Sequence, residues 1–238
     1  MGPNGTGRKR AARFITLEGI DGAGKSTQVR LLAAALRAAG REVLSLREPG
    51  GVRISEKIRS LLLDPENGDM CDTCELLLYE AARAQLVHEI VAPALAAGKT
   101  VVCDRFFDST TAYQGYADGL DLVAVARANE LAVGARRPDL TLVFDIDPKE
   151  AAARREGRGD GADRLEARGL AFQEKVARGF RAIAQGEPER VALVDARGDI
   201  AEVFSRAVDA VRAKGIDIPD AAAAEALARE DAGRGGGR

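Results

Sequence analysis

The sequence is poor in cysteine and histidine: its 238 residues include three cysteines and one histidine. An odd cysteine count argues against a disulfide framework, so we expect a protein of the reducing cytoplasm. Cys71 and Cys74 have the CxxC spacing of half a zinc site, but the sequence has no second pair and its single histidine is distant. The start of a helix, capped by Asp72 or Thr73, explains the pair more simply. Whether the two cysteines ever pair with each other stays open.

Long apolar runs and a surplus of positive charge are also missing. No apolar stretch approaches the ~20 residues that a membrane-spanning helix needs, which excludes membrane spanning on length. The formal net charge is -2, so there is no overall basic field to hold nucleic acid. We therefore expect neither a nucleic-acid nor a membrane partner, and any anion site has to be local.

The sequence does contain a regular alternation of two patterns. Five strand-like segments, FITLEG, EVLSLREP, TVVCDRF, LTLVFDID and VALVDA, are separated by Ala-, Leu- and Arg-rich segments with helical periodicity. This predicts an α/β fold with about five parallel strands and helices on both faces. One helix is expected over about 25–39, and a longer one over about 73–97 with a kink or restart at Pro93.

The two ends of the chain lack this pattern. Residues 1–11 are rich in Gly, Arg and Lys and are predicted to be a mobile leader, residues 12–213 to be a single domain, and residues 214–238 to be a flexible C-terminal tail. Within the domain, the segment at about 153–166 is basic and interrupted by glycines. We interpret it as a short flap, or LID.

A glycine-rich turn follows the first strand. Gly19, Gly24, Lys25 and Ser26 match GxxxxGK[ST], between an apolar strand and a helical pattern. The turn's inward N–H groups and the helix N-terminus favour a polyphosphate; Lys25 can bridge its β- and γ-phosphates, and Ser26 can bind magnesium. A turn that serves only tight packing is the less favoured alternative. The predicted ATP-binding residues are Gly19, Ile20, Asp21, Gly22, Ala23, Gly24, Lys25, Ser26 and Thr27.

Two more segments lie where a second substrate should bind. LREPGG ends the second strand and CDRFFDSTTAYQGY ends the third, and open parallel sheets bind ligands at the carboxyl ends of their strands. Asp104 and Arg105 should therefore face the glycine turn, although an ion-paired strand end would also explain them. Tyr79 and Arg83 share one helix face, but spacing alone favours an ordinary half-buried tyrosine beside a solvated arginine.

Six segments together resemble bacterial thymidylate kinase: EGIDGAGKST, REPGG, LLLYEAARAQ, DRFFDSTTAYQG, RRPDLTLVFDI and DRLE, in that family's order. The resemblance implies a P-loop NTPase fold, with 12–213 as one kinase domain. It also implies transfer of the γ-phosphoryl group of ATP to dTMP, giving dTDP, with magnesium as cofactor, in a cytoplasmic homodimer. Another nucleoside or nucleotide kinase and a non-catalytic ATP-binding module are the alternatives.

The resemblance also implies roles for single residues. Arg105 would hold the dTMP phosphate and the group in transfer, Asp104 would orient magnesium with Ser26, and Asp21 would lie near the sugar 3′-hydroxyl. Tyr79 and Arg83 would hold the thymine ring. Tyr113 would exclude a 2′-hydroxyl, although core packing explains a tyrosine there equally well. The substrate-binding residues implied in this way are Asp21, Pro49, Tyr79, Arg83, Arg105, Ser109, Thr110, Tyr113 and Gln114.

The flap arginines form the last group of candidates. The glycine turn has Gly22 and no arginine between its glycines, so another cation has to meet the charge of the transition state. In the bacterial subtype of the family the flap supplies this cation, whereas charge clusters in general are usually solvated. The flap candidates are Arg154, Arg155, Arg158 and Arg164, and the predicted catalytic residues are Lys25, Arg105, Arg154 and Arg158.

Overall fold

The protein folds around one five-stranded sheet. A computed structural model describes residues 11–156 and 168–235. The strands lie in the order β2-β3-β1-β4-β5, and each neighbouring pair is parallel. The predicted α/β class and five-stranded parallel sheet are thus confirmed. The strands are β1 (Phe14–Glu18), β2 (Val43–Arg47), β3 (Thr100–Asp104), β4 (Leu140–Asp145) and β5 (Val191–Asp195).

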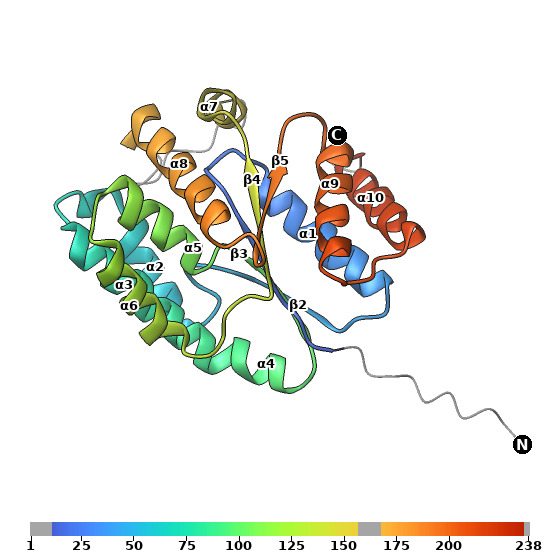
Figure 1. The fold of residues 1–238 in the computed structure, drawn as a ribbon, viewed down its shortest axis with the longest axis horizontal. Coiled ribbons are helices and arrows are strands. Elements are labelled where there is room, and N and C mark those ends of the chain that lie inside the picture. Colours follow the sequence, from blue (N-terminus) through green and yellow to red (C-terminus); the bar gives the residue numbers. More distant parts are fainter. Residues whose placement is uncertain (1–10, 157–167, 236–238) are drawn as a thin grey trace, which may run out of the picture.

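Helices cover both faces of this sheet. Figure 1 shows α1, α9 and α10 on one side and α3, α6 and α8 on the other. All five residues of β1 are buried, as expected for a strand in a parallel sheet covered on both faces. The helices are α1 (Lys25–Ala38), α2 (Arg53–Leu63), η1 (Pro65–Asn67), α3 (Asp72–Leu86), η2 (Val87–Val91), α4 (Ala92–Ala96), α5 (Phe107–Thr110), η3 (Thr111–Ala117), α6 (Leu122–Val133), α7 (Pro148–Glu156), α8 (Leu170–Gly186), α9 (Ile200–Ala213) and α10 (Asp220–Gly235).

The long helix predicted before the third strand is present as three consecutive pieces. α3, the π-helical turn η2 and α4 follow one another without a break from Asp72 to Ala96. Pro93 lies in the first turn of α4. Because proline has no backbone N–H to donate, a change in the hydrogen-bonding pattern just before it is expected.

The C-terminal segment differs from the expected flexible tail. α10 packs against α1, and Figure 1 shows the two helices side by side. Ile216, Ile218, Ala222 and Ala226 are buried in the main apolar core. Alanines four residues apart form a narrow apolar face that permits close helix packing. The prediction of a flexible tail over 214–238 is therefore wrong for α10. Residues 1–10 of the expected leader lie outside the described residues.

Within 11–156 and 168–235, every helix is too short or too polar to cross a membrane.

Candidate active site

The glycine-rich turn joins β1 to α1 at the carboxyl edge of the sheet. Gly19, Gly22 and Gly24 have φ angles of 139°, 92° and 88°, in the region that favours glycine. A Cβ atom on Gly22 would lie 2.2 Å from the carbonyl oxygen of Ala151 in α7, and one on Gly19 would lie 2.7 Å from that of Phe144. α7 and β4 therefore pack directly on the turn, which explains why the Gly22 position carries no arginine.

Lys25 is the first residue of α1, and its ammonium group lies inside the turn. Its Nζ donates to the carbonyl oxygen of Ile20 at 2.8 Å and lies 3.8 Å from Oδ1 of Asp21. Burial, together with the nearby Arg105, lowers the pKa of Lys25 to about 8, although Asp21 opposes this shift. A buried cation beside a helix N-terminus is an arrangement that favours a bound polyphosphate.

The two residues predicted to hold a metal ion meet directly. Asp104 ends β3 and pairs with Leu17 of β1, so it lies next to the strand that leads into the turn. The Oγ of Ser26 donates a hydrogen bond to Oδ2 of Asp104 at 2.8 Å. A hydroxyl and a carboxylate oxygen thus lie side by side at the start of α1.

Arg105 faces the turn from the end of β3. It has a φ of 68° and is the one described non-glycine residue with a positive φ. Its Nη1 donates to the carbonyl oxygen of Gly19 at 3.1 Å, and its Nη2 forms an ion pair with Asp21. The Tyr113 hydroxyl also donates to Asp21, at 3.2 Å. Burial would raise the pKa of Asp21, but Arg105 and Lys25 outweigh it and lower the pKa to about 2.

Arg83 of α3 is held in a buried ionic cluster. Its Nε donates to Oε2 of Glu48 at 2.7 Å, and its Nη1 pairs with Glu80 and donates to the Thr110 hydroxyl at 2.9 Å. The arginine is 2% exposed, so the expectation of a solvated side chain from spacing alone is wrong. Burial raises the pKa of Glu48 to about 7, against the pull of Arg83.

One cavity of about 350 Å³ joins these groups. Tyr79 of α3 lines it and packs against the buried Leu62. Gln114 also lines it, and its Nε2 donates to Oε1 of Glu75 at 2.6 Å. The predicted site residues that line the cavity are Asp21, Gly22, Gly24, Lys25, Ser26, Thr27, Pro49, Tyr79, Arg83, Asp104, Arg105, Ser109, Thr110, Tyr113, Gln114 and Arg155.

The flap arginines have different positions. Arg154 does not line the cavity: its Nη1 donates to the carbonyl oxygen of Ala196 at 3.0 Å, and its Nη2 pairs with Glu150 at 2.7 Å. Arg155, one residue further along α7, lines the cavity. Arg158 and Arg164 lie outside the described residues.

Comparison with known proteins gives the family. The Thymidylate kinase family model matches residues 17–207. A thymidylate kinase from Desulfosudis oleivorans is 48% identical over 204 residues, which cover 83% of this chain and 95% of that protein. The chain belongs to the thymidylate kinase family. A thymidylate kinase from Syntrophotalea carbinolica is 49% identical over 198 residues, covering 81% of this chain and 92% of the relative.

A solved thymidylate kinase structure has the same fold. The crystal structure of the enzyme from Ehrlichia chaffeensis is 34% identical in sequence and has a TM-score of 0.70. The match covers 85% of this chain and 99% of that one. The family model ends at residue 207, so α10 lies beyond the part of the chain that it matches.

The cavity of this thymidylate kinase family member also includes residues that the sequence interpretation did not single out. Arg47, Glu48, Arg59 and Leu63 line it. Arg47 and Glu48 belong to the LREPGG segment, so the position of this segment at a strand end was a usable signal. Arg59 and Leu63 lie on α2, where no motif marks them.

Proposed function

We propose that this protein transfers the γ-phosphoryl group of ATP to dTMP, giving ADP and dTDP, with magnesium as cofactor. One observation carries the proposal: a single cavity joins the phosphate-binding turn to the Asp104–Arg105 strand end and to the Tyr79–Arg83 face of α3. A kinase needs these two binding regions to share one space, because the phosphoryl group has to pass directly between them.

The ATP phosphates would lie in the turn. Lys25 would hold the β- and γ-phosphates, and the backbone N–H groups from Gly22 to Thr27 would surround them. Arg105 lines the same cavity beside Asp21 of the turn, and would bind the dTMP phosphate and the group in transfer. Cations placed around the moving phosphoryl group stabilise the charge on its equatorial oxygens.

Ser26 and Asp104 have the chemistry needed to hold magnesium. They offer two hard oxygen ligands from neighbouring positions, and magnesium in phosphoryl-transfer sites is usually held by one or two such side chains together with substrate phosphates. When bound, the ion neutralises charge on the β- and γ-phosphate oxygens. Asp21 lies in the same region and would contact the sugar 3′-hydroxyl or water near the ion.

The base and sugar would occupy the α3 side of the cavity. Tyr79 would stack on thymine, and Arg83, whose guanidinium is fixed by Glu48 and Glu80, would donate to the edge of the base. Tyr113 lies beside Asp21 and would restrict space at the 2′ position of the sugar. Pro49, Ser109, Thr110 and Gln114 complete the substrate-binding set.

The glycine-rich turn has no arginine between its glycines. The cation that stabilises the charge of the transition state would instead come from the segment after β4. Arg155 is the described flap residue that lines the cavity. Arg154, Arg158 and Arg164 remain candidates for a closed, substrate-bound state in which the flap covers the phosphates. Arg154 would first have to leave its contacts with Glu150 and Ala196.

We further propose that the protein is a cytoplasmic homodimer. α2, α3 and α6 pack side by side and carry exposed apolar side chains, which include Leu61, Leu77 and Val123 at 51%, 58% and 57% exposure. Exposed apolar side chains on neighbouring helices are typical of an interface between subunits. All three cysteines are free thiols, consistent with a reducing compartment. Light scattering during gel filtration would measure a mass of twice 25.1 kDa for the dimer.

A phosphate-acceptor panel tests the proposed reaction. Purified protein is mixed with ATP, magnesium and either dTMP, dUMP, dCMP or thymidine, and nucleoside diphosphate is quantified by chromatography. We expect dTDP from dTMP, at the highest kcat/KM of the four, and no product when EDTA removes magnesium. Preference for another acceptor would favour a different nucleotide kinase, and ATP binding without transfer to any acceptor would favour a non-catalytic module.

A further inference from the structure

We propose that Glu18 is a positioning residue for phosphoryl transfer, which acts through Ser109 to fix the guanidinium group of Arg105. This inference rests on the proposed function, because it assumes that Arg105 contacts the phosphoryl group in transfer. Glu18 itself does not line the cavity described above. Its effect on the reaction would therefore be indirect.

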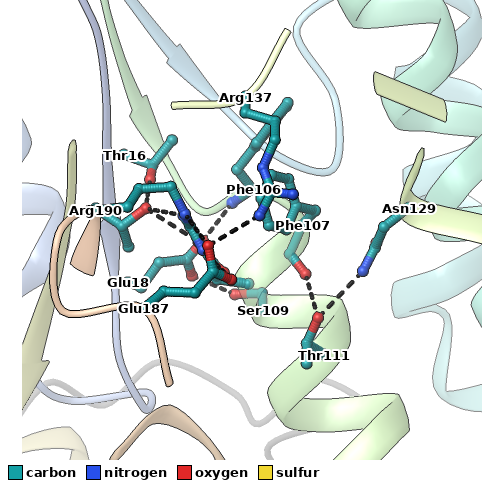
Figure 2. Close-up of polar contacts among 12 residues, drawn as sticks. Thr16, Glu18, Phe106, Phe107, Ser109, Thr111, Asn129, Arg137, Glu187 and Arg190 are labelled. Carbon is teal, nitrogen blue, oxygen red and sulfur yellow. Dashed lines mark hydrogen bonds and ion pairs between the residues drawn. The ribbon is translucent and has the colours of Figure 1, made fainter. Parts of the chain in front are cut away.

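Glu18 is the last residue of β1 and is fully buried. Both of its carboxyl oxygens contact the start of the segment that follows Arg105. Oε1 accepts a hydrogen bond from the backbone N–H of Phe106 at 2.7 Å, and Oε2 accepts one from the Ser109 hydroxyl at 2.6 Å. Figure 2 shows Glu18 lying between these two partners at the N-terminus of α5.

Ser109 connects this carboxyl group to the site. Nη1 of Arg105 donates to the same Ser109 Oγ at 3.0 Å. The serine oxygen therefore has the guanidinium of Arg105 on one side and Glu18 on the other. Ser109 cannot rotate away from Arg105 without losing its hydrogen bond to the buried carboxyl group of Glu18. The serine therefore holds the guanidinium in place.

The backbone of Arg105 needs the same support. Its φ of 68° is uncommon for a residue with a Cβ atom and is maintained only when surrounding contacts fix it. Leu17 accepts a hydrogen bond from the Arg105 N–H at 3.0 Å, and Glu18, the next residue of β1, accepts one from the Phe106 N–H. β1 thus holds both peptide groups of this turn.

A second set of contacts anchors α5 without touching Arg105. Asp108 forms a bidentate ion pair with Arg190, at 2.6 and 2.7 Å, and accepts a hydrogen bond from the Thr141 hydroxyl. Thr141 in turn shares a hydrogen bond with Thr16 at 2.8 Å. Figure 2 shows Thr16 and Arg190 beside the Glu18 group. The fold thus has an independent way to fix α5.

An uncharged side chain could fill the Glu18 position at lower cost if packing were its only task. Burial of a carboxyl group is unfavourable and is offset here by the two hydrogen bonds described above and by the nearby charge of Arg105. Because both bonds end on the segment that presents Arg105, we infer that the carboxyl group serves the geometry of that arginine.

The test compares Glu18→Ala, Glu18→Gln, Ser109→Ala and the Glu18→Ala/Ser109→Ala double variant in the dTMP kinase assay. Thr16→Val is the matched control, because Thr16 is a fully buried polar residue of the same strand that contacts Thr141 instead of Ser109. Thermal melting establishes which variants are folded. Ser109→Ala removes the connection without emptying the buried Glu18 position, so an unchanged kcat in this variant would overturn the proposal even if Glu18→Ala does not fold.

We expect Glu18→Ala and Ser109→Ala each to lower kcat by about tenfold or more, with the KM for ATP changed less than about threefold, because a small misplacement of a catalytic group is costly. Glu18→Gln should restore most of kcat, since an amide can also bond to Ser109 and to the Phe106 N–H. The double variant should be no slower than the slower single variant.

Two results would overturn the inference in an active enzyme: a folded Glu18→Ala or Ser109→Ala variant with the kcat of Thr16→Val, or losses that multiply in the double variant. Failure of the wild-type protein to make dTDP would instead contradict the proposed function. The two failures are therefore distinguishable.

Discussion

The Ser26 hydroxyl donates a hydrogen bond to Oδ2 of Asp104 at 2.8 Å, although 78 residues separate the two in the chain. This contact links the start of α1, where Lys25 lies, to the end of β3, which Arg105 follows; both residues line the cavity. A magnesium ion that binds here would be held by the Ser26 and Asp104 oxygens, in place of the hydrogen bond between them.

Asp104→Asn should therefore weaken the binding of magnesium during the reaction. An amide oxygen carries no full charge, so we expect the magnesium concentration at half-maximal rate to rise about tenfold or more. Titration of magnesium at saturating ATP and dTMP measures this midpoint. Asp139→Asn is the control, because Asp139 caps the N–H of Phe14 at the opposite edge of the sheet, at 2.7 Å. Equal midpoints for the two variants would exclude Asp104 as a ligand.

Arg83→Ala should reduce stability as well as dTMP binding. It would leave Glu48 and Glu80, at 4% and 7% side-chain exposure, as buried carboxylates without their cation. Loss of one partner from a buried ion pair costs about 3–5 kcal/mol. Urea unfolding at pH 8 measures the free energy, and Arg178→Ala, an exposed site on α8, is the control. A loss below about 1 kcal/mol would show that this cluster is hydrated.

Glu18 should also make stability depend on pH. Burial is the main cause that raises its pKa to about 8, and Asp108 adds to the shift, whereas hydrogen bonds from Ser109 and Phe106 and the charge of Arg105 oppose it. A raised carboxyl pKa contributes stability that is complete below the unfolded value, near 4.5, and is lost as the pH rises through about 8.

The glutamine side chain of Glu18→Gln does not titrate in this pH range, so it lacks the ionisation that destabilises the wild-type protein at high pH. Between pH 5.5 and pH 9 the wild-type protein should therefore lose more unfolding free energy than Glu18→Gln, and denaturant unfolding across that range measures both. Parallel pH profiles of the two proteins would contradict the raised pKa. The Ser109 contact is compatible with either form of the carboxyl group, because a hydroxyl can both donate and accept.

Much of this arrangement could be predicted from sequence because it depends on local patterns. The five strands and the turn from Gly19 to Thr27 follow from apolar runs and glycine spacing. The meeting of Asp104 with Ser26 follows from one general property of parallel sheets, the convergence of strand ends. These features do not require knowledge of how distant side chains pack.

The remaining features depend on packing that a linear pattern does not contain. Arg154 and Arg155 are adjacent in a basic run, and only the orientation of α7 determines which of them faces the cavity. In the sequence, Glu18 is an ordinary polar residue at the end of a strand. Its contacts with Ser109 and Phe106 depend on how the segment after β3 packs against β1. Alanine indicates neither burial nor exposure by itself, so the alanine-rich sequence after residue 213 does not reveal that α10 packs on α1.

The most direct test of the central claim is the rate of dTDP formation by Lys25→Met. The claim is that the buried ammonium in the turn grips the phosphates of ATP during transfer to dTMP. We predict a loss in kcat of about a hundredfold to a thousandfold, the usual cost of removing a preorganised charge from a transition state. Lys99→Met, at a half-exposed surface lysine, should keep the wild-type rate. Turnover by Lys25→Met equal to that of Lys99→Met would contradict the account.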